Sequence, residues 1–525
     1  MAPDEAVMRR KRFAVSGATL SAFILVASIL CGAGRAQAGA EPIWPTRQWQ
    51  TSTPEAQGID PAALVRLLDF GASHRFDSLL IARRGQIVLD AYYAPYTADI
   101  PHVINSATKA VIGTLTAIAT REGLLDSTNH PTLDFFSGRN IANPDDRKKA
   151  ITVQSLLDMT SGIDWIESID GGREDTLIEY GHSPDLIQFV LDRPMSNAPG
   201  EVFNYDSGNP HLLSAILGKL AGIDSWDYAK AKLFEPLGIG TSGWRLDGQG
   251  VTIGGGGLLL LPRDAAKIGY LYLRGGEWEG KRLLPAAWID RVNHPTVDMH
   301  ASFDPDLRYA NFFWALPNKH VYMAVGYRCQ LIMAFPQLDI VAVTTARDSC
   351  PIGRLADLIS GAVTSETASA ADPAGAGLLA DKIRDISIER PTKVGATPEM
   401  ASAISGKSYR FPTNDLNVKS LSLTLTGPQP HYELEIYTRY QSSASLKFSG
   451  PIGLDGLYRK GPPTPLGVIA LKGTWLNGHE FAMNLRLVGG DSDRKWILSF
   501  DGDRPRLRGK DGDGREVSVD GEAGG

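Results

Sequence analysis

The chain has 525 residues, a length that exceeds one ordinary hydrophobic core and predicts about two to four domains. Hydrophobic residues make up 43% of it and charged residues 21%, as is typical of a soluble globular protein. The formal net charge of −6 gives no reason to expect nucleic acid or an anionic membrane as a partner. The ten histidines are scattered without metal-ligand spacing, so we expect no metal site.

The N-terminal segment has the pattern of a signal peptide. Basic residues at positions 9–12 precede the apolar run "FAVSGATLSAFILVASIL", and "AQA" at positions 36–38 fits a cleavage site. We therefore predict that residues 1–38 are removed and that the mature protein is secreted, to the periplasm, without an integral membrane span. An uncleaved membrane anchor is the alternative, because the apolar run borders on spanning length. A lipoprotein is not favoured, since Leu30 precedes Cys31 where a small residue is needed.

The next part of the chain alternates strand and helix patterns. "SLLIARRGQIVLDAYY" predicts a β-hairpin at positions 78–93. "TKAVIGTLTAIATREG" predicts a helix that Gly123 closes. Further along, "GGGG" at positions 254–257 lacks the context of a phosphate-binding loop, so we interpret it as a tight approach of two backbones.

The pattern changes near residue 366. The small-residue stretch "TSETASAADPAGAG" predicts a loose connection. Beyond it, period-two stretches such as "SLSLTLTG", "HYELEIYTRY" and "EFAMNLRLVG" predict antiparallel strands of a barrel or sandwich. We therefore predict an α+β protein with a mixed α/β domain at 45–365, a linker region at 366–404 and a smaller antiparallel β domain at 405–525.

Ser106 and Lys109, in "INSATKAVIG", are the first candidates for chemistry. Their spacing of three places both side chains on one face of a helix that starts at Ser106. A serine at the N-terminal end of a helix also gains backbone N–H groups that face developing negative charge. The alternative is that Ser106 only caps the helix and Lys109 is solvated. A lone serine–x–x–lysine is weak evidence, so other motifs must decide.

Two further stretches support a catalytic serine. Tyr205, in "PGEVFNYDSGNPHLLSAIL", precedes a new helix near Gly208. A serine nucleophile needs a base, and a lysine or a tyrosine can serve when its pKa falls. "VYMAVGYRCQLIMAFPQLDIVAVTTA" predicts a β-hairpin with a glycine inside a strand, where another backbone or a substrate can come close.

Together, "SATK", "YDS" and "AVGYRCQ" resemble the three active-site motifs of the serine β-lactamase and penicillin-binding-protein superfamily, and most closely those of class C-like esterases and 6-aminohexanoate-oligomer hydrolases. "LLDMTSGIDW" and "LFEPLGI" are also similar to phrases of that family, and the resemblance spans about residues 50–365. It implies an antiparallel sheet packed by helices beside a helical subdomain. It also implies that Ser106 is the nucleophile, Lys109 its general base and Tyr205 the proton relay. The oxyanion hole would be the backbone N–H groups of Ser106 and Tyr327.

This sequence departs from the family pattern at three places. The third motif begins with Ala324 where β-lactamases carry lysine or histidine, and Arg328 could restore the missing charge. Cys329 stands where related sequences often carry glycine, and Ser207 where asparagine is common. These departures favour an esterase or amidase over a β-lactamase. We expect four residues to contact the substrate: Ser207, Gly326, Arg328 and Trp165.

The sequence therefore predicts a cofactor-free serine hydrolase that forms an acyl-enzyme with a small ester or amide. The alternatives are a β-lactamase or D-amino-acid peptidase, and a non-catalytic binding or sensor protein with the same fold. The two cysteines beyond the signal peptide, Cys329 and Cys350, allow one disulfide in an oxidising compartment, or two inert thiols.

Overall fold

A computed structural model describes residues 42–524, apart from 170–171, 241, 439–440, 465–466, 491–492, 503 and 512–513. The predicted signal peptide and Cys31 lie outside the described residues. The described residues belong to one compact unit that starts at Pro42. Among them, no helix has both the length and the apolar character needed to cross a bilayer.

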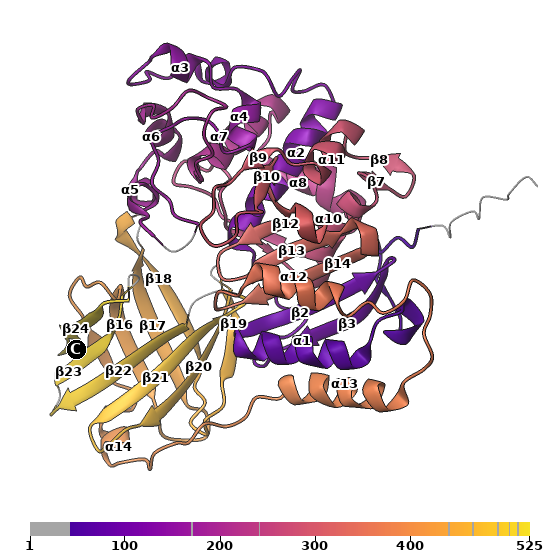
Figure 1. The fold of residues 1–525 in the computed structure, drawn as a ribbon. Coiled ribbons are helices and arrows are strands. Elements are labelled where there is room, and N and C mark those ends of the chain that lie inside the picture. The colour runs from indigo at the N-terminus through magenta and orange to yellow at the C-terminus, as the bar shows by residue number, and fades with distance from the viewer. Residues whose placement is uncertain are drawn as a thin grey trace, which may run out of the picture. The chain divides into compact units, whose positions relative to one another are not determined.

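The largest sheet in the described part of the chain has nine strands, in the order β1-β3-β2-β14-β13-β12-β11-β10-β9 (Figure 1). All neighbours are antiparallel except β1 and β3, which are parallel. The strands β2, β13 and β14 are buried along their whole length, so the core lies at the centre of the sheet. The strands are β1 (Gln50–Thr51), β2 (Phe76–Arg83), β3 (Gln86–Tyr92), β9 (Val297–Asp298), β10 (Arg308–Ala310), β11 (Phe313–Leu316), β12 (Val321–Gly326), β13 (Gln330–Phe335) and β14 (Ile340–Ala346).

The predicted first hairpin is confirmed as β2 and β3. Arg83 pairs with Gln86 across a two-residue turn. Both turn residues, Arg84 and Gly85, have positive φ, at 52° and 78°. Turns of this kind match the right-handed twist of paired strands, which explains the tight connection.

Helices pack against the sheet and also form a separate helical region. The helices α1 (Pro61–Ser73) and α10 (Pro262–Leu273) lie against β2, β13 and β14, and α12 (Ile352–Ser360) contacts α1. Figure 1 shows α3 to α7 gathered beyond one end of the sheet. The remaining helices of this part are α2 (Thr108–Arg121), α3 (Asp146–Lys149), α4 (Val153–Leu157), α5 (Asp175–His182), α6 (Leu186–Asp192), α7 (Gly208–Ala221), α8 (Ser225–Ala229), α9 (Glu235–Leu237) and α11 (Ala286–Asn293).

Short strands and helical turns complete this part. A three-stranded sheet has the order β4-β6-β5, with β4 (His102–Val103), β5 (Ser242–Trp244) and β6 (Leu258–Leu260). The strands β7 (Glu277–Trp278) and β8 (Lys281–Arg282) form a hairpin. The short helical turns are η1 (Glu55–Gln57), η2 (Asn105–Ala107), η3 (Thr132–Phe136), η4 (Lys230–Phe234), η5 (Pro317–Lys319) and η6 (Pro336–Leu338).

The stretch predicted as a linker contains a helix. Asp372 accepts the backbone N–H of Gly375 and so caps α13 (Pro373–Ile386), whose Leu379 is buried. This helix packs on α1. A shorter helix, α14 (Met400–Ile404), follows before the first strand of the C-terminal part. The domain boundaries given above stay a prediction.

The C-terminal part consists of two antiparallel sheets around a core of its own, as the sequence predicted. The sheet orders are β18-β17-β16-β15-β25 and β19-β20-β21-β22-β23-β24. Buried side chains from both sheets, among them Tyr409, Trp475 and Trp496, form one cluster. Its strands are β15 (Ser408–Arg410), β16 (Val418–Thr424), β17 (His431–Thr438), β18 (Gln441–Pro451), β19 (Arg459–Thr464), β20 (Gly467–Trp475), β21 (Glu480–Val488), β22 (Asp493–Asp501), β23 (Arg504–Lys510), β24 (Glu516–Asp520) and β25 (Glu522–Ala523).

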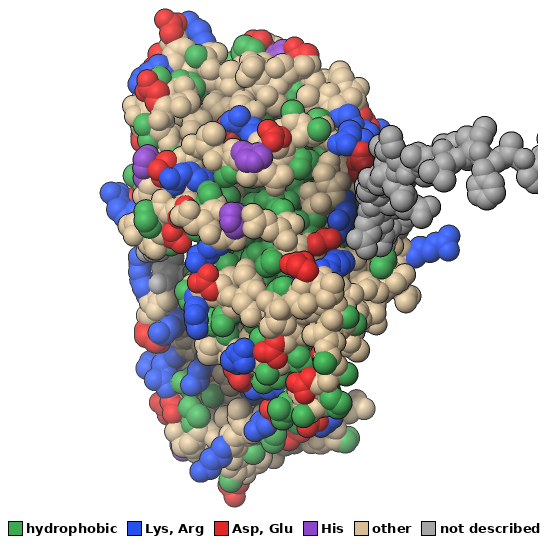
Figure 2. Space-filling view, turned by 45° about the vertical axis from the view of Figure 1, so that its right-hand side comes forward, with side chains coloured by type: hydrophobic (Ala, Val, Ile, Leu, Met, Phe, Trp, Pro, Cys, Tyr) green, Lys and Arg blue, Asp and Glu red, His purple; other side chains and the backbone are tan. Residues whose placement is uncertain are grey.

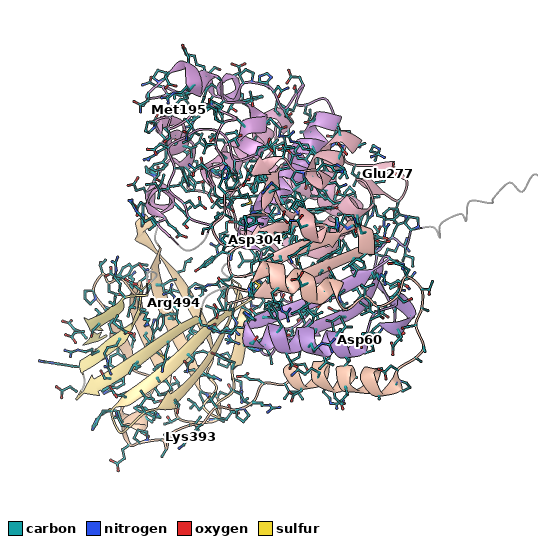
Figure 3. The ribbon with its side chains drawn as sticks, viewed as in Figure 1. Asp60, Met195, Glu277, Asp304, Lys393 and Arg494 are labelled. Atoms are coloured by element: carbon teal, nitrogen blue, oxygen red, sulfur yellow. A yellow bond between two sulfur atoms is a disulfide. The ribbon has the colours of Figure 1, made fainter. Side chains whose placement is uncertain are left out.

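Side chains fill the space between the sheets and the helices, with Met195 in the helical region and Arg494 on β22 (Figure 3). Figure 2 shows lysine and arginine side chains interspersed with aspartate and glutamate over one face of the molecule. This mixture agrees with the small net charge of the sequence. The predicted α+β class is confirmed.

Candidate functional site

Ser106 lies in η2, directly before α2, and Lys109 lies in the first turn of that helix. Lys109 Nζ donates a hydrogen bond to Ser106 Oγ over 2.8 Å, as the spacing of three predicted. The side chain of Ser106 does not cap α2, whose N-cap position is Ala107. The alternative of a serine that only caps the helix is therefore not what the structure contains.

Lys109 is buried, with 1% of its surface exposed, and its Nζ atom has polar neighbours. Besides Ser106, the Gly255 carbonyl oxygen accepts a hydrogen bond from Nζ at 3.0 Å. Nζ also lies 4.7 Å from the centre of the Tyr205 ring. Tyr205 itself is largely buried and packs edge-to-face on Trp314 at 6.2 Å. The structure thus brings the predicted serine, lysine and tyrosine into one cluster.

The glycine run at 254–257 allows the backbone to approach α7 closely. A Cβ atom on Gly254 would lie 2.0 Å from the Pro210 carbonyl oxygen. One on Gly255 would lie 3.0 Å from the Ser207 carbonyl oxygen. The predicted tight approach is confirmed, and it is what presents the Gly255 carbonyl to Lys109.

The end of β12 meets the loop that carries Ser106. A Cβ atom on Gly326 would lie 2.2 Å from the Ile104 carbonyl oxygen, so only glycine fits there. Asn105 Nδ2 donates to the Tyr327 carbonyl oxygen over 3.1 Å, which holds the two backbones together. The backbones of Ser106 and Tyr327 are therefore neighbours, and the assignment of their N–H groups to an oxyanion hole stays a prediction.

In the third motif, the positively charged residue is Arg328 on the turn after β12, whereas the strand itself carries Ala324. Ala324 is buried on β12 and pairs with Ile332 of β13. Arg328 follows the strand, and its guanidinium lies 5.0 Å from the centre of the exposed Tyr327 ring. Arg328 and Cys329 both have positive φ, at 60° and 58°, and form the tight turn into β13. Arg328 thus sits beside the site without occupying the position of Ala324.

Cys329 and Cys350 form a disulfide, with their Cα atoms 5.9 Å apart. The bridge ties the turn after β12 to the segment that follows β14. This Cα separation lies in the usual range for disulfides, and the bond resolves the choice between a bridge and two free thiols.

Near Tyr205 lies the carboxylate of Glu167, which the sequence alone did not indicate. Glu167 accepts hydrogen bonds from the backbone N–H of Ser207 at 2.8 Å and from Ser207 Oγ at 2.6 Å. Trp165 Nε1 donates to the same carboxylate over 2.8 Å. Ser207 and Trp165 are both buried, so in this structure the two predicted substrate contacts hold Glu167 in place. No regular pattern in the sequence marks Glu167, because it lies in an irregular loop.

Asp206, inside the quoted "YDS" motif, is almost fully buried next to Tyr205. Its Oδ1 atom accepts the backbone N–H groups of Gly208 and Asn209. Burial and the nearby Glu167 carboxylate nevertheless raise the pKa of Asp206 to about 8. Asp206 therefore holds a proton at neutral pH.

No group of three histidine, cysteine, aspartate or glutamate side chains lies close enough to hold a metal ion in the part of the chain that the structure describes. The cluster of Ser106, Lys109 and Tyr205 brings together a hydroxyl, an amine and a phenol. Such groups support nucleophilic attack and proton transfer.

The Beta-lactamase family model matches residues 70–325. The chain is 23% identical over 288 residues to the 6-aminohexanoate-dimer hydrolase of Paenarthrobacter ureafaciens, a match that covers 51% of this chain and 71% of that protein. A structure of a candidate 6-aminohexanoate-dimer hydrolase from Bacillus anthracis is similar with a TM-score of 0.50 and 18% identity, over 60% of this chain and 86% of that one. EstCE1, described as a hydrolase with promiscuous acyltransferase activity, gives a TM-score of 0.49 and 16% identity over 58% of this chain and 99% of its own.

Proposed function

We propose that this protein hydrolyses a small ester or amide through an acyl-enzyme on Ser106, because residues 70–325 match the Beta-lactamase family model and the site brings Ser106, Lys109 and Tyr205 together. The observation that carries the proposal is the 2.8 Å hydrogen bond between buried Lys109 and Ser106 Oγ. A serine hydroxyl within hydrogen-bond distance of a potential base is the arrangement in which a serine can be activated as a nucleophile.

In the first half of the reaction, Ser106 Oγ attacks the substrate carbonyl carbon and Lys109 Nζ, as general base, accepts the hydroxyl proton. The backbone N–H groups of Ser106 and Tyr327 stabilise the negative charge on the carbonyl oxygen. Tyr205, whose ring adjoins Lys109 Nζ, passes a proton to the leaving alcohol or amine as its bond to carbon breaks. Water then attacks the acyl carbon, and Lys109 and Tyr205 take a proton from the water. The same proton returns to Ser106 Oγ as its bond to the acyl carbon breaks, and the carboxylic acid is released.

The charges around the cluster favour an uncharged substrate. A carboxylate held by a charge-assisted hydrogen bond gains about 1.5–3 kcal/mol, and Ala324 offers no such bond. Glu167, beside Tyr205, adds a negative charge that repels a carboxylate. A short acyl ester or a neutral amide loses nothing by either feature. The name of the Paenarthrobacter relative makes a small linear amide the second substrate class to test.

The test compares kcat/KM for p-nitrophenyl butyrate, for a small linear amide and for nitrocefin. We expect ready ester hydrolysis. For nitrocefin, we expect a kcat/KM about tenfold to a hundredfold below the value that a lysine or histidine at position 324 would give. This factor corresponds to the energy of the missing charge-assisted hydrogen bond. Arg328→Ala is the decisive variant, because Arg328 carries a positive charge on the turn that directly follows β12. Efficient β-lactam hydrolysis that Arg328→Ala selectively removes would refute the preference for esters.

Export to the periplasm belongs to the same proposal. It rests on the basic, apolar and small-residue pattern of positions 1–38. The disulfide between Cys329 and Cys350 supports it, because such bonds persist in oxidising compartments. N-terminal sequencing of protein from a periplasmic extract tests cleavage after residue 38.

A further inference from the structure

The segment that leads to Ser106 receives contacts from the C-terminal β part. The backbone N–H of Val103, in β4, donates to the Gly489 carbonyl oxygen over 2.7 Å. The next residue, Ile104, donates its N–H to the Leu258 carbonyl oxygen over 3.0 Å. One neighbour of this segment thus comes from the short β6 strand, and the other comes from the connection after β21.

Gly489 has the backbone conformation and the lack of a side chain that this contact requires. Its φ is 80°, and a Cβ atom there would lie 2.2 Å from the Pro101 carbonyl oxygen. A side chain at this position would push the segment and the β part apart. Tyr96 and Ile100, just before β4, also share a buried cluster with Ala470 and Val488 of β20 and β21.

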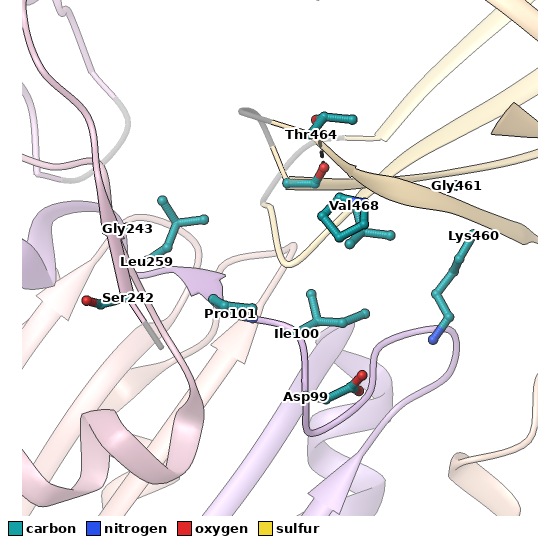
Figure 4. A pocket seen from close by; sticks show the side chains of 12 residues that line it. Asp99, Ile100, Pro101, Ser242, Gly243, Leu259, Lys460, Gly461, Thr464 and Val468 are labelled. Atoms are coloured by element: carbon teal, nitrogen blue, oxygen red, sulfur yellow. Dashed lines mark hydrogen bonds between the residues drawn. The ribbon is translucent and has the colours of Figure 1, made fainter. Parts of the chain in front are cut away.

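Figure 4 shows the loop with Ile100 and Pro101 facing Val468 and Thr464, and Asp99 and Lys460 beside it. A cavity of about 450 Å³ remains there, lined by these residues and by Leu259 of β6.

A row of alternating charges links the same elements. Asp493, at the start of β22, accepts hydrogen bonds from Arg347 at 2.6 Å, from Arg75 at 2.5 Å and from Arg486 at 3.2 Å. Arg347 also donates to Asp77 on β2 over 3.0 Å. Burial alone would raise the pKa of Asp493, but Arg486 and Arg347 lower it, so the carboxylate keeps its charge.

The row ends on β4. Asp77 Oδ2 lies 3.1 Å from His102 Nε2, and His102 Nδ1 lies 2.8 Å from the Val103 carbonyl oxygen. The Asp77 carboxylate and the Val103 carbonyl oxygen thus contact the two nitrogens of one buried ring. Val103 is therefore held at its N–H by Gly489 and at its carbonyl by His102.

We propose that Gly489 and Asp493 of the C-terminal β part are positioning residues for the reaction, because they hold the β4 segment that places Ser106. The inference rests on the proposed role of Ser106. The β4 strand has two residues, so its own hydrogen bonds fix it weakly. The contacts from Gly489 and through Asp493, Arg347 and Asp77 supply the missing constraint, three residues before the nucleophile.

The test uses full-length protein with Asp493→Asn, which removes the charge, and Gly489→Ala, which forces the backbones apart. Asp520→Asn is the matched control, because it removes an exposed ion pair with Arg506 in the same β part. Hydrogen exchange of residues 100–107, resolved to single amides by NMR, reports directly on the Val103 N–H. Kinetics of p-nitrophenyl butyrate hydrolysis and the rate of labelling by a fluorophosphonate report on Ser106.

We expect both variants to exchange the Val103 amide at least about tenfold faster and to lose about tenfold in kcat and in labelling rate, with KM within about twofold. Asp493→Glu, which keeps the carboxylate, should recover part of the loss, and Asp520→Asn should behave as wild type. Unchanged exchange and labelling in folded Asp493→Asn and Gly489→Ala would overturn the inference, as would an equal loss in Asp520→Asn. If the fluorophosphonate does not label Ser106 in wild type, the proposed function itself is refuted. If it labels wild type and the two variants equally well, only the role of the C-terminal β part is refuted.

Discussion

Gly326→Ala tests the approach of β12 to the loop that carries Ser106. The new Cβ atom would lie 2.2 Å from the Ile104 carbonyl oxygen. Carbon and oxygen atoms that are not bonded come no closer than about 3.3 Å, so one of the two backbones must move by about 1 Å. The collision partner is backbone, which cannot rotate away as a side chain can.

A displacement of about 1 Å in a catalytic group costs about a hundredfold in rate, or about 2.7 kcal/mol of transition-state stabilisation. We therefore expect kcat/KM for p-nitrophenyl butyrate to fall by about this factor in Gly326→Ala, chiefly through kcat. Overpacking also destabilises the fold by about 1–3 kcal/mol, so the assay should run well below the unfolding temperature measured for the variant.

Gly138→Ala is the matched control, because a Cβ atom at Gly138 meets nothing within 4 Å. It should leave kcat/KM unchanged. If Gly326→Ala is folded and keeps kcat/KM within about threefold of wild type, then the close contact does not place the catalytic groups and the reasoning fails.

Three other changes probe the cluster itself. Ser106→Ala should abolish ester turnover and barely shift the thermal unfolding midpoint, because Ser106 caps no helix; near-normal hydrolysis would remove it from the mechanism. Lys109→Ala should lose nearly as much activity, since groups that act as one unit fail together, and retained activity would place the base elsewhere. Asp206→Asn should alter how stability depends on pH. The folded wild type keeps this proton to about pH 8, whereas the unfolded chain releases it near about pH 4. The contribution of Asp206 to folding therefore falls as pH rises through that window, by about 1.4 kcal/mol per unit. Urea unfolding at pH 5, 6 and 7 should show that the unfolding free energy of wild type falls relative to that of Asp206→Asn as the pH rises. A difference between the two proteins that stays constant with pH would contradict this expectation.

Much of the site could be predicted because its determinants are local. The spacing of three between Ser106 and Lys109 places the two side chains within reach of each other, and the structure shows the contact. The turn at Arg84 and Gly85 is likewise encoded by two adjacent residues. The family resemblance supplied Tyr205, which no periodic pattern connects to Ser106, and the structure places it beside Lys109.

The parts that escaped prediction depend on contacts between distant residues. Glu167 acquires its place from Ser207, 40 positions away, across an irregular loop. The bond between Val103 and Gly489 joins two segments that each look ordinary in sequence. The helix α13 escaped because small residues dominate its first turn, and its packing on α1 supplies what its sequence pattern lacks.

The Gly255 carbonyl that accepts a hydrogen bond from Lys109 bears on protein engineering. This partner is a main-chain atom, as are the two N–H groups assigned to the oxyanion. Randomising side chains at positions such as 324 and 328 would therefore alter the shape and charge around the substrate without deleting these partners. The protein should consequently tolerate a library at those positions while it keeps the proposed ester hydrolysis. Directed evolution toward amides or bulkier acyl groups can therefore begin from active variants and not from inactive ones.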